Sequence, residues 1–231
     1  MQLDPIDWQR VGQDMETLGH ARLGRQLDEP TCAWLARLRH EDGVFRRRIV
    51  MERHAYGVGS YAYFDRPLPE PVDRMRRDLY GPLARIADEM MARLGRDRRF
   101  PPDLDGFLAE CRMAGQTLPT PLLLHYDEDG WNALHRDLYG DIAFPLQVVV
   151  MLSRPDRDFE GGEFLLVERR PRMMSRGEAI RLEQGEALVF PTAERAVHGR
   201  RGWTRAEVRH GVSRVRRGSR TTLGIIFHDA A

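Results

Sequence analysis

The sequence contains no lysine, so arginine supplies all 36 of its basic side chains. This absence excludes chemistry that needs a lysine amine, such as a Schiff base with a carbonyl substrate. The arginines run from Arg10 to Arg220, and 35 acidic residues balance them to a net charge of +1. We interpret the arginine content as a compositional bias rather than as a surface for nucleic acid, with a local basic patch as the alternative.

Cysteine and long apolar runs are also scarce. Cys32 and Cys111 stand far apart and lack the paired spacing of a zinc ribbon or a redox motif, so we expect two small buried apolar side chains. No apolar stretch reaches the length of a bilayer span. The first ten residues lack the basic start and apolar stretch of a secretory signal, and we therefore expect a cytoplasmic protein with no membrane partner.

The composition is that of an ordinary globular protein, with 42% hydrophobic and 31% charged residues among 231. A chain of this length is expected to form one domain. We divide that domain into a helical and outer-strand part, residues 1–116, and a core of strands, residues 117–231.

The first part shows helical and strand patterns in turn. Apolar spacing predicts helix over residues 8–39, with the second half beginning after Asp28. Residues 45–64 change to a β pattern and are expected to form outer strands. Amphipathic spacing then predicts a long helix over residues 72–94 and a shorter one over residues 104–113.

The second part reads as strand after strand, separated by glycine-rich turns. The predicted strands cover residues 122–126, 144–152, 163–168, 179–182, 187–190, 210–215 and 220–227. Helices followed by strands favour an α+β fold, with a layer of N-terminal helices packed on a double-stranded β-helix, or jelly-roll, core.

His135 and Asp137 form the first candidate for chemistry. Because they are two residues apart, an extended backbone directs both side chains to the same face, where they can bind one metal ion. Such a pair is weak evidence alone, so a third ligand is needed. The downstream candidates are His198, His210 and His228.

The chemistry of a facial metal site separates these histidines. Two histidines and one carboxylate leave three positions of an iron ion open, and an organic dicarboxylate bound there needs a further cation. His228 has no arginine after it, whereas His210 is followed by Arg220 and His198 by Arg209. This test sets aside His228 alone. We expect His198 to lie in a solvated, arginine-rich loop, and the geometry of the segment after His210 makes His210 the preferred ligand.

The segment from His210 to residue 227 predicts a tight hairpin, with Gly218 in its loop. The expected register places His210, Arg220 and Thr222 on one sheet face, with His210 and Arg220 roughly 13 Å apart at about 3.3 Å per residue. That separation suits a metal ion and a five-carbon diacid. Arg220 would grip the far carboxylate through two parallel hydrogen bonds, and Thr222 would add a hydroxyl donor.

This set of residues resembles a known pattern. His135-Arg-Asp137, then His210, then Arg220 ten residues later is similar to the iron and 2-oxoglutarate pattern of the prolyl-hydroxylase-like dioxygenases, over roughly residues 122–229. A bacterial group of such oxygenases, some named for an action on damaged nucleic acid, resembles the chain more closely. That closer resemblance rests on LHRDLYG at 134–140, GGEF at 161–164, RHGVS at 209–213 and LGIIFHD at 223–229.

The resemblance implies the cofactors and their ligands. Fe(II) would be held by His135, Asp137 and His210, with 2-oxoglutarate as cosubstrate and dioxygen as the third reactant. Tyr126 resembles the tyrosine that hydrogen-bonds the cosubstrate in many of these enzymes, and a buried core tyrosine is the alternative. Asn132 and Gln147 are further candidates for that role.

The expected activity is therefore hydroxylation of a protein side chain, an amino acid or a small metabolite, with release of succinate and CO2. One alternative is the same chemistry applied to oxidative demethylation of alkylated nucleic acid, with Trp131 and Trp203 as local stacking candidates. A second alternative is a jelly-roll protein that binds a metal or ligand without turnover, which Arg220 disfavours. A zinc hydrolase would lack an evident general base. The arginine-rich loop 169–176, with Met173 and Met174, is either a substrate lid or a solvated connection.

Overall fold

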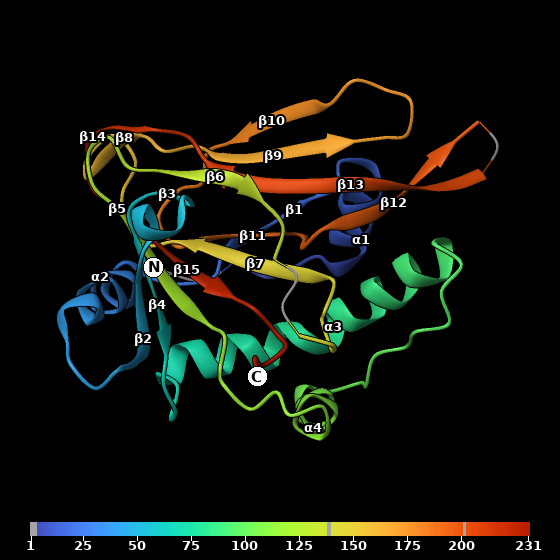
Figure 1. Cartoon of the computed structure of the whole chain (residues 1–231), viewed down its shortest axis with the longest axis horizontal. Helices are drawn as coiled ribbons and strands as arrows, with labels where there is room; N and C mark the ends of the chain where they lie inside the picture. Colours follow the sequence, from blue (N-terminus) through green and yellow to red (C-terminus); the bar gives the residue numbers. More distant parts are fainter. Residues whose placement is uncertain (1–3, 138–139, 201) are drawn as a thin grey trace.

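Two antiparallel sheets face each other, and helices cover the outer side of the larger one in the computed structural model, which describes residues 4–137, 140–200 and 202–231 (Figure 1). The larger sheet has the strand order β1–β11–β7–β15–β5–β4–β2, and the smaller one β10–β9–β13–β6–β3, with β12 also paired to β13. Strands β8 and β14 form a separate ribbon. The larger sheet comprises β1 (Ala21–Arg25), β2 (Phe45–Val50), β4 (Ser60–Phe64), β5 (Leu122–Tyr126), β7 (Leu146–Met151), β11 (Glu186–Pro191) and β15 (Arg220–Ile225). The smaller sheet and the ribbon comprise β3 (Gly57–Val58), β6 (Trp131–His135), β8 (Phe159–Gly161), β9 (Phe164–Arg169), β10 (Arg176–Ile180), β12 (Glu194–Gly199), β13 (Gly202–Val212) and β14 (Val215–Gly218).

The helices confirm most of the predicted helical segments. They are α1 (Trp8–Thr17), α2 (Glu29–Arg37), α3 (Glu70–Arg93) and α4 (Leu104–Met113), with 3-10 turns η1 (Leu38–His40) and η2 (Met51–His54). Asp28 caps α2 by accepting a hydrogen bond from the backbone N–H of Thr31, as expected from its position. Helices α3 and α4 match the predictions within two residues.

One predicted helical segment is wrong, because residues 8–39 contain strand β1 between α1 and α2. Gly19 has a φ of +88° and ends α1, a stop signal that the helical spacing concealed. The strand pairs with β11 at the edge of the larger sheet, and Arg22 binds Glu186 across that pair. Pairing with β11 thus overrides the weak strand propensity of the sequence ARLGR.

The larger sheet separates two apolar cores. Val148 and Val150 of β7 pack with helix α3 on the outer side, whereas Val149 and Met151 pack between the two sheets. Alternate residues of one strand therefore serve both cores, which explains why β7 is buried along its whole length. The interior between the sheets is where the candidate ligands lie.

Helix α3 is tied to the segment that follows β15. Arg76 of α3 is buried, and its guanidinium donates to the carbonyls of Ile226 (2.9 Å) and Phe227 (2.8 Å) and to the carboxylate of Asp229 (2.9 Å). Because both charges are removed from solvent and hydrogen-bonded, breaking this pair would leave an uncompensated buried charge. The contact fixes the end of the strand that carries Arg220.

His228 lies in this segment and is not part of the group formed by His135, Asp137 and His210. It is fully buried, and its Nδ1 accepts a hydrogen bond from the backbone N–H of Phe144 at 3.2 Å. Burial, and then the charge of Arg76, lower the pKa of His228 to about 4. The sequence-based exclusion of His228 agrees with this placement.

The depressed pKa of His228 predicts a loss of stability in acid. Between its ordinary pKa of 6.5 and about 4, the unfolded chain binds a proton that the folded protein does not, so falling pH favours unfolding. In urea unfolding at pH 7 and pH 5, the wild type should lose about 2 kcal/mol more than His228→Asn, which keeps an acceptor for Phe144 but does not titrate. An equal loss in both proteins would contradict the assignment.

Candidate metal centre

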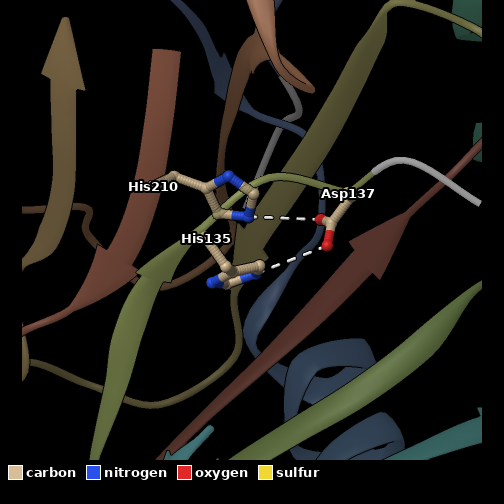
Figure 2. Close-up of side chains that lie close together, drawn as sticks. All are labelled: His135, Asp137 and His210. Carbon is tan, nitrogen blue, oxygen red and sulfur yellow. Dashed lines mark ion pairs between the residues drawn. The ribbon is translucent and has the colours of Figure 1, made fainter. Parts of the chain in front are cut away.

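The strand register brings His135 and His210 together. They are directly opposite each other on the antiparallel strands β6 and β13, so their side chains leave the same sheet face. Asp137 follows two residues after the end of β6. Figure 2 shows both imidazoles pointing toward its carboxylate, with His210 Nε2 3.2 Å from Oδ2 and His135 Nε2 3.4 Å from Oδ1. The three possible ligand atoms lie within 4.8 Å of one another.

The electrostatics of this group suit a cation. Burial alone would raise the pKa of Asp137, but the two imidazoles hold it well below its usual range, so the carboxylate is ionised. Burial lowers the pKa of His210. His135 is oriented by a hydrogen bond from Nδ1 to the carbonyl of Ala133 at 2.7 Å, which leaves Nε2 free to bind a metal. Two imidazole nitrogens and one carboxylate are the donor set of a non-haem iron(II) site, so the residues fit this metal.

The predicted hairpin between His210 and Arg220 is wrong. Strand β13 belongs to the smaller sheet and β15 to the larger one, while the intervening β14 pairs with β8. His210 and Arg220 therefore reach the same interior from facing sheets rather than from adjacent strands. The expectation that both line one pocket survives, because the chain crosses from one sheet to the other between them.

Arg220 is a buried cation without an anionic partner among the described residues. Its side chain is 1% exposed, and none of its three guanidinium nitrogens has a hydrogen-bond partner among the described residues. Burial lowers the pKa of Arg220 to about 10, which leaves it protonated at neutral pH. An unpaired buried charge is costly, so its retention here indicates a bound anion in the working protein.

Tyr126 and Thr222 lie beside Arg220, as predicted. Tyr126 is opposite Arg220 on β5 and carries the guanidinium over its ring at 5.6 Å. Its hydroxyl accepts a hydrogen bond from Asn132 at 3.2 Å. Thr222 is two residues further along β15, on the same face of the strand. Gln147 lies near the candidate ligands instead, with its Nε2 3.4 Å from His210 Nε2. Arg220, Tyr126 and Thr222 thus line one pocket together with the three candidate ligands.

That pocket is a cavity of about 280 Å³ between the two sheets. Asp137 is the one acidic side chain among the described residues that line it, and Arg136 and Arg220 are the basic ones. The remaining wall is mostly apolar or aromatic. A small diacid and part of a second molecule can be enclosed there together.

Gly162 fixes the course of the Arg220 side chain. Its φ is +61°, and a Cβ added to it would lie 2.7 Å from Arg220 Cδ. We expect Gly162→Ala to weaken 2-oxoglutarate binding about tenfold, because the new methyl group displaces the guanidinium of Arg220. The free energy of unfolding should fall by about 1–2 kcal/mol, because alanine strains a backbone with positive φ.

Calorimetric titration of 2-oxoglutarate into the metal-loaded protein measures the first effect. Gly177→Ala is the matched control, because Gly177 has no atom within 4 Å of an added Cβ and does not need a positive φ. Equal affinity in wild type and Gly162→Ala would show that Gly162 does not position Arg220.

Other residues singled out in the sequence lie elsewhere. His198 is exposed, as expected, but on strand β12 rather than in a loop, with its ring against Trp203. Cys32 and Cys111 are buried and unpaired, as expected. None of the described residues of loop 169–176 lines the cavity, so the structure offers no support for a lid, and Met173 and Met174 are exposed in the turn between β9 and β10. Part of the motif at 134–140 cannot be placed, since residues 138 and 139 lie outside the described residues.

The cavity also contains residues that the sequence did not identify as part of a site. Tyr56, Tyr61 and Tyr63 line the cavity, but the sequence pattern marked them only as part of outer strands. Arg136 also lines it, between two candidate ligands. The period-two spacing of Tyr61 and Tyr63 could have placed them on one face, and the strand pairing β4–β5 then puts that face toward the pocket.

Known proteins share much of this sequence and its fold. Residues 59–230 match the model of the Oxygenase-NA family, described as "Oxygenase, catalysing oxidative methylation of damaged DNA". Two uncharacterized proteins of Mycobacterium tuberculosis, from strains CDC 1551 and H37Rv, are each 49% identical over 193 residues, which cover 81% of this chain and 83% of theirs.

Solved structures show the same fold at low identity. A prolyl-4-hydroxylase of Pseudomonas putida aligns with a TM-score of 0.56 and 16% identity, over 97% of this chain and 99% of its own. An oxidoreductase of the 2OG-Fe(II) oxygenase family from Burkholderia pseudomallei aligns at 0.56 and 15%, over 100% and 95%. A Trichoplax adhaerens prolyl hydroxylase, in complex with a peptide of hypoxia inducible factor, aligns at 0.55 and 15%, over 96% and 89%. These likenesses confirm the predicted α+β fold with a jelly-roll core.

No helix among the described residues is long and apolar enough to cross a membrane.

Proposed function

The chain belongs to the Oxygenase-NA family, and on that premise we propose that it is an iron(II)- and 2-oxoglutarate-dependent dioxygenase that hydroxylates a primary substrate. His135, Asp137 and His210 would hold the iron, and Arg220, with Thr222 and Tyr126, the cosubstrate. The observation that carries the proposal is the buried guanidinium of Arg220, which has no partner among the described residues and lines the same cavity as the His–Asp–His group.

The protein's own side chains have defined tasks in this scheme. When bound, iron(II) and 2-oxoglutarate supply the oxidising chemistry, which consumes dioxygen and releases succinate and CO2. Asp137 is kept ionised by its neighbours, and Ala133 holds His135 in the tautomer that presents Nε2. Arg220 orients a carboxylate through its fixed fork of donors. The apolar wall limits water beside the site.

The primary substrate is proposed to be a protein side chain, an amino acid or a small metabolite. The family description supports the alternative that the substrate is alkylated nucleic acid, in which case hydroxylation of a carbon attached to nitrogen would lead to demethylation. Trp131 and Trp203, the stacking candidates from the sequence, do not line the cavity; Trp203 lies under Arg93 of helix α3. The division into residues 1–116 and 117–231 and the cytoplasmic location remain predictions from the sequence.

The test is 2-oxoglutarate turnover by protein loaded with iron(II) under nitrogen. We expect a visible absorption band that depends on both iron and 2-oxoglutarate, and slow succinate formation once oxygen is admitted. A protein that binds the metal but shows neither the band nor any calorimetric binding of 2-oxoglutarate would be a metal binder without this activity.

A further inference from the structure

Three consecutive arginines on strand β2 differ in what they contact. Arg46 lies over the Tyr63 ring, 4.6 Å from its centroid, and donates to a backbone carbonyl of the segment before β5 at 2.8 Å. Arg48 donates to two carbonyls near the end of η1 at 2.6 and 2.7 Å. The guanidinium of Arg47, between them, has no ion pair or hydrogen bond with any described residue, and its side chain is exposed. The structure therefore uses the outer two arginines and leaves the middle one available.

The strand register directs Arg47 toward the cavity. Arg47 is opposite Tyr63 on β4, and Tyr63 is opposite Leu122 on β5, so the three side chains share one sheet face. Tyr63 and Leu122 line the cavity. Burial raises the pKa of Tyr61 and Tyr63, and Arg47 is among the positive charges that oppose this rise, in keeping with its place beside both rings. Arg47 thus stands at the outer edge of the tyrosine wall.

Arg136 is a free cation that lines the cavity itself. It lies between the candidate ligands His135 and Asp137, it is exposed, and it lines the cavity. Within residues 4–137, 140–200 and 202–231, no ion pair or hydrogen bond engages its guanidinium. Strand β2, at the edge of the larger sheet, and the segment after β6 thus each contribute one arginine whose guanidinium has no partner among the described residues.

The charge balance of the inner site bears on what Arg47 and Arg136 can bind. If the proposed function holds, two positive charges of iron and one of Arg220 are balanced by Asp137 and by the two carboxylates of the cosubstrate. Nothing in that group offsets Arg47 and Arg136, and the described lining has no acidic residue besides Asp137. The remaining positive charge must be matched by solvent ions or by the primary substrate.

The tyrosine wall beside Arg47 suits a flat or apolar body. Tyr61 and Tyr63 meet edge to face with ring centroids 5.6 Å apart, and Leu124 lies opposite Tyr61 on β5. Tyr56, which is 49% exposed, extends the aromatic surface outward. Aromatic faces of this kind bind planar or apolar groups next to a polar anchor.

We propose that the outer part of the cavity is a subsite for a small organic anion, whose phosphate or carboxylate binds Arg47 and Arg136 and whose planar or apolar body lies against Tyr61 and Tyr63. This inference rests on the proposed function, because the inner site must be neutral for the outer charges to select the substrate. It defines the primary substrate by charge and shape. A neutral or cationic side chain of a protein is disfavoured by it.

The test uses phenyl phosphate as the probe and calorimetry as the readout, on protein loaded with manganese(II) and 2-oxoglutarate so that no turnover occurs. We expect phenyl phosphate to bind, and benzyl alcohol, a neutral aromatic probe of smaller size, to bind at least about tenfold more weakly. Arg47→Gln and Arg136→Gln should each weaken phenyl phosphate binding about fivefold to tenfold, and added salt should weaken it further. Benzyl alcohol binding should be the same in all variants.

The matched control is Arg85→Gln, which removes one exposed arginine from helix α3 on the outer side of the larger sheet. It should bind phenyl phosphate as the wild type does. Phenylacetate in place of phenyl phosphate distinguishes a carboxylate from a phosphate as the preferred anion. Equal binding of phenyl phosphate and benzyl alcohol, or equal effects of Arg47→Gln and Arg85→Gln, would overturn the inference.

Two further outcomes are decided by the same titrations. If a short single-stranded oligonucleotide binds through Arg47 and Arg136 while both small anions fail, the subsite serves a nucleic-acid backbone and the small-anion inference is wrong. If 2-oxoglutarate itself does not bind the manganese-loaded protein, the proposed function fails first. Binding of 2-oxoglutarate without any response to the outer arginines leaves the function intact and rejects only the subsite.

Discussion

Replacing His210 with alanine is expected to lower the affinity for iron(II) at least about a thousandfold and to reduce 2-oxoglutarate-dependent succinate formation to background. His210 is buried between the sheets and provides one of the two imidazoles that face Asp137. Without it, His135 and Asp137 remain as two ligands, which are too few to retain a divalent ion against water. Metal content after dialysis and succinate formation measure the two effects.

His198→Ala is the control for this change, since His198 is exposed on β12 and does not line the cavity. It should retain both iron and turnover. Unfolding of His210→Ala without metal shows whether the variant is folded, and His210→Gln, which keeps more of the side-chain volume, replaces it if it is not. A folded variant that still binds iron with wild-type affinity would remove His210 from the proposed site.

Replacing Arg220 with methionine is expected to have two effects of opposite sign. The affinity for 2-oxoglutarate should fall about a hundredfold to a thousandfold, because two charge-assisted hydrogen bonds are lost in a buried place. The free energy of unfolding without ligand should rise by about 1–3 kcal/mol, because an unpaired guanidinium is replaced by an apolar side chain of similar length. A gain in stability with a loss of function is the trade-off expected where a binding site keeps an unpaired buried charge.

Calorimetric titration and urea unfolding test these effects separately. Saturating 2-oxoglutarate should stabilise the metal-loaded wild type but not Arg220→Met, because only a ligand that binds the folded state shifts unfolding. Arg220→Lys is the control, since it keeps the charge and loses the fork, and it should fall between the two in affinity. If Arg220→Met binds 2-oxoglutarate as tightly as the wild type does, another residue holds the far carboxylate.

The sequence was sufficient for the parts of the site that depend on local spacing. His135 and Asp137 are two residues apart, so an extended backbone directs both to one side whatever the rest of the fold does. The need for a cation beyond the metal set aside His228, but the choice of His210 over His198 used the predicted hairpin. The hairpin is wrong, and His210 and Arg220 line one cavity because the chain crosses from one sheet to the other between them.

The parts that the sequence could not predict depend on pairing between distant strands. Strand β1 is defined by its neighbour β11, and its own sequence resembles a helix. Arg47 looks like one of three solvated arginines until the register of β2, β4 and β5 gives it a direction. Gly162 lies in a recognisable motif, but its role needs the close approach to Arg220 that only the fold shows.

The position of β15 in the larger sheet sets the order in which this protein can be completed during synthesis. It follows the other described strands in the chain, yet it lies between β5 and β7, so it joins two groups of strands made earlier. Until residues 220–225 leave the ribosome, β5 and β7 each present an open edge of unpaired backbone groups. Strand β15 pairs with β5 and β7 and also carries Arg220, so the sheet closes when Arg220 takes its place. A nascent chain that can bind the cosubstrate therefore no longer exposes the unpaired edges of β5 and β7, at which strands of other chains could add.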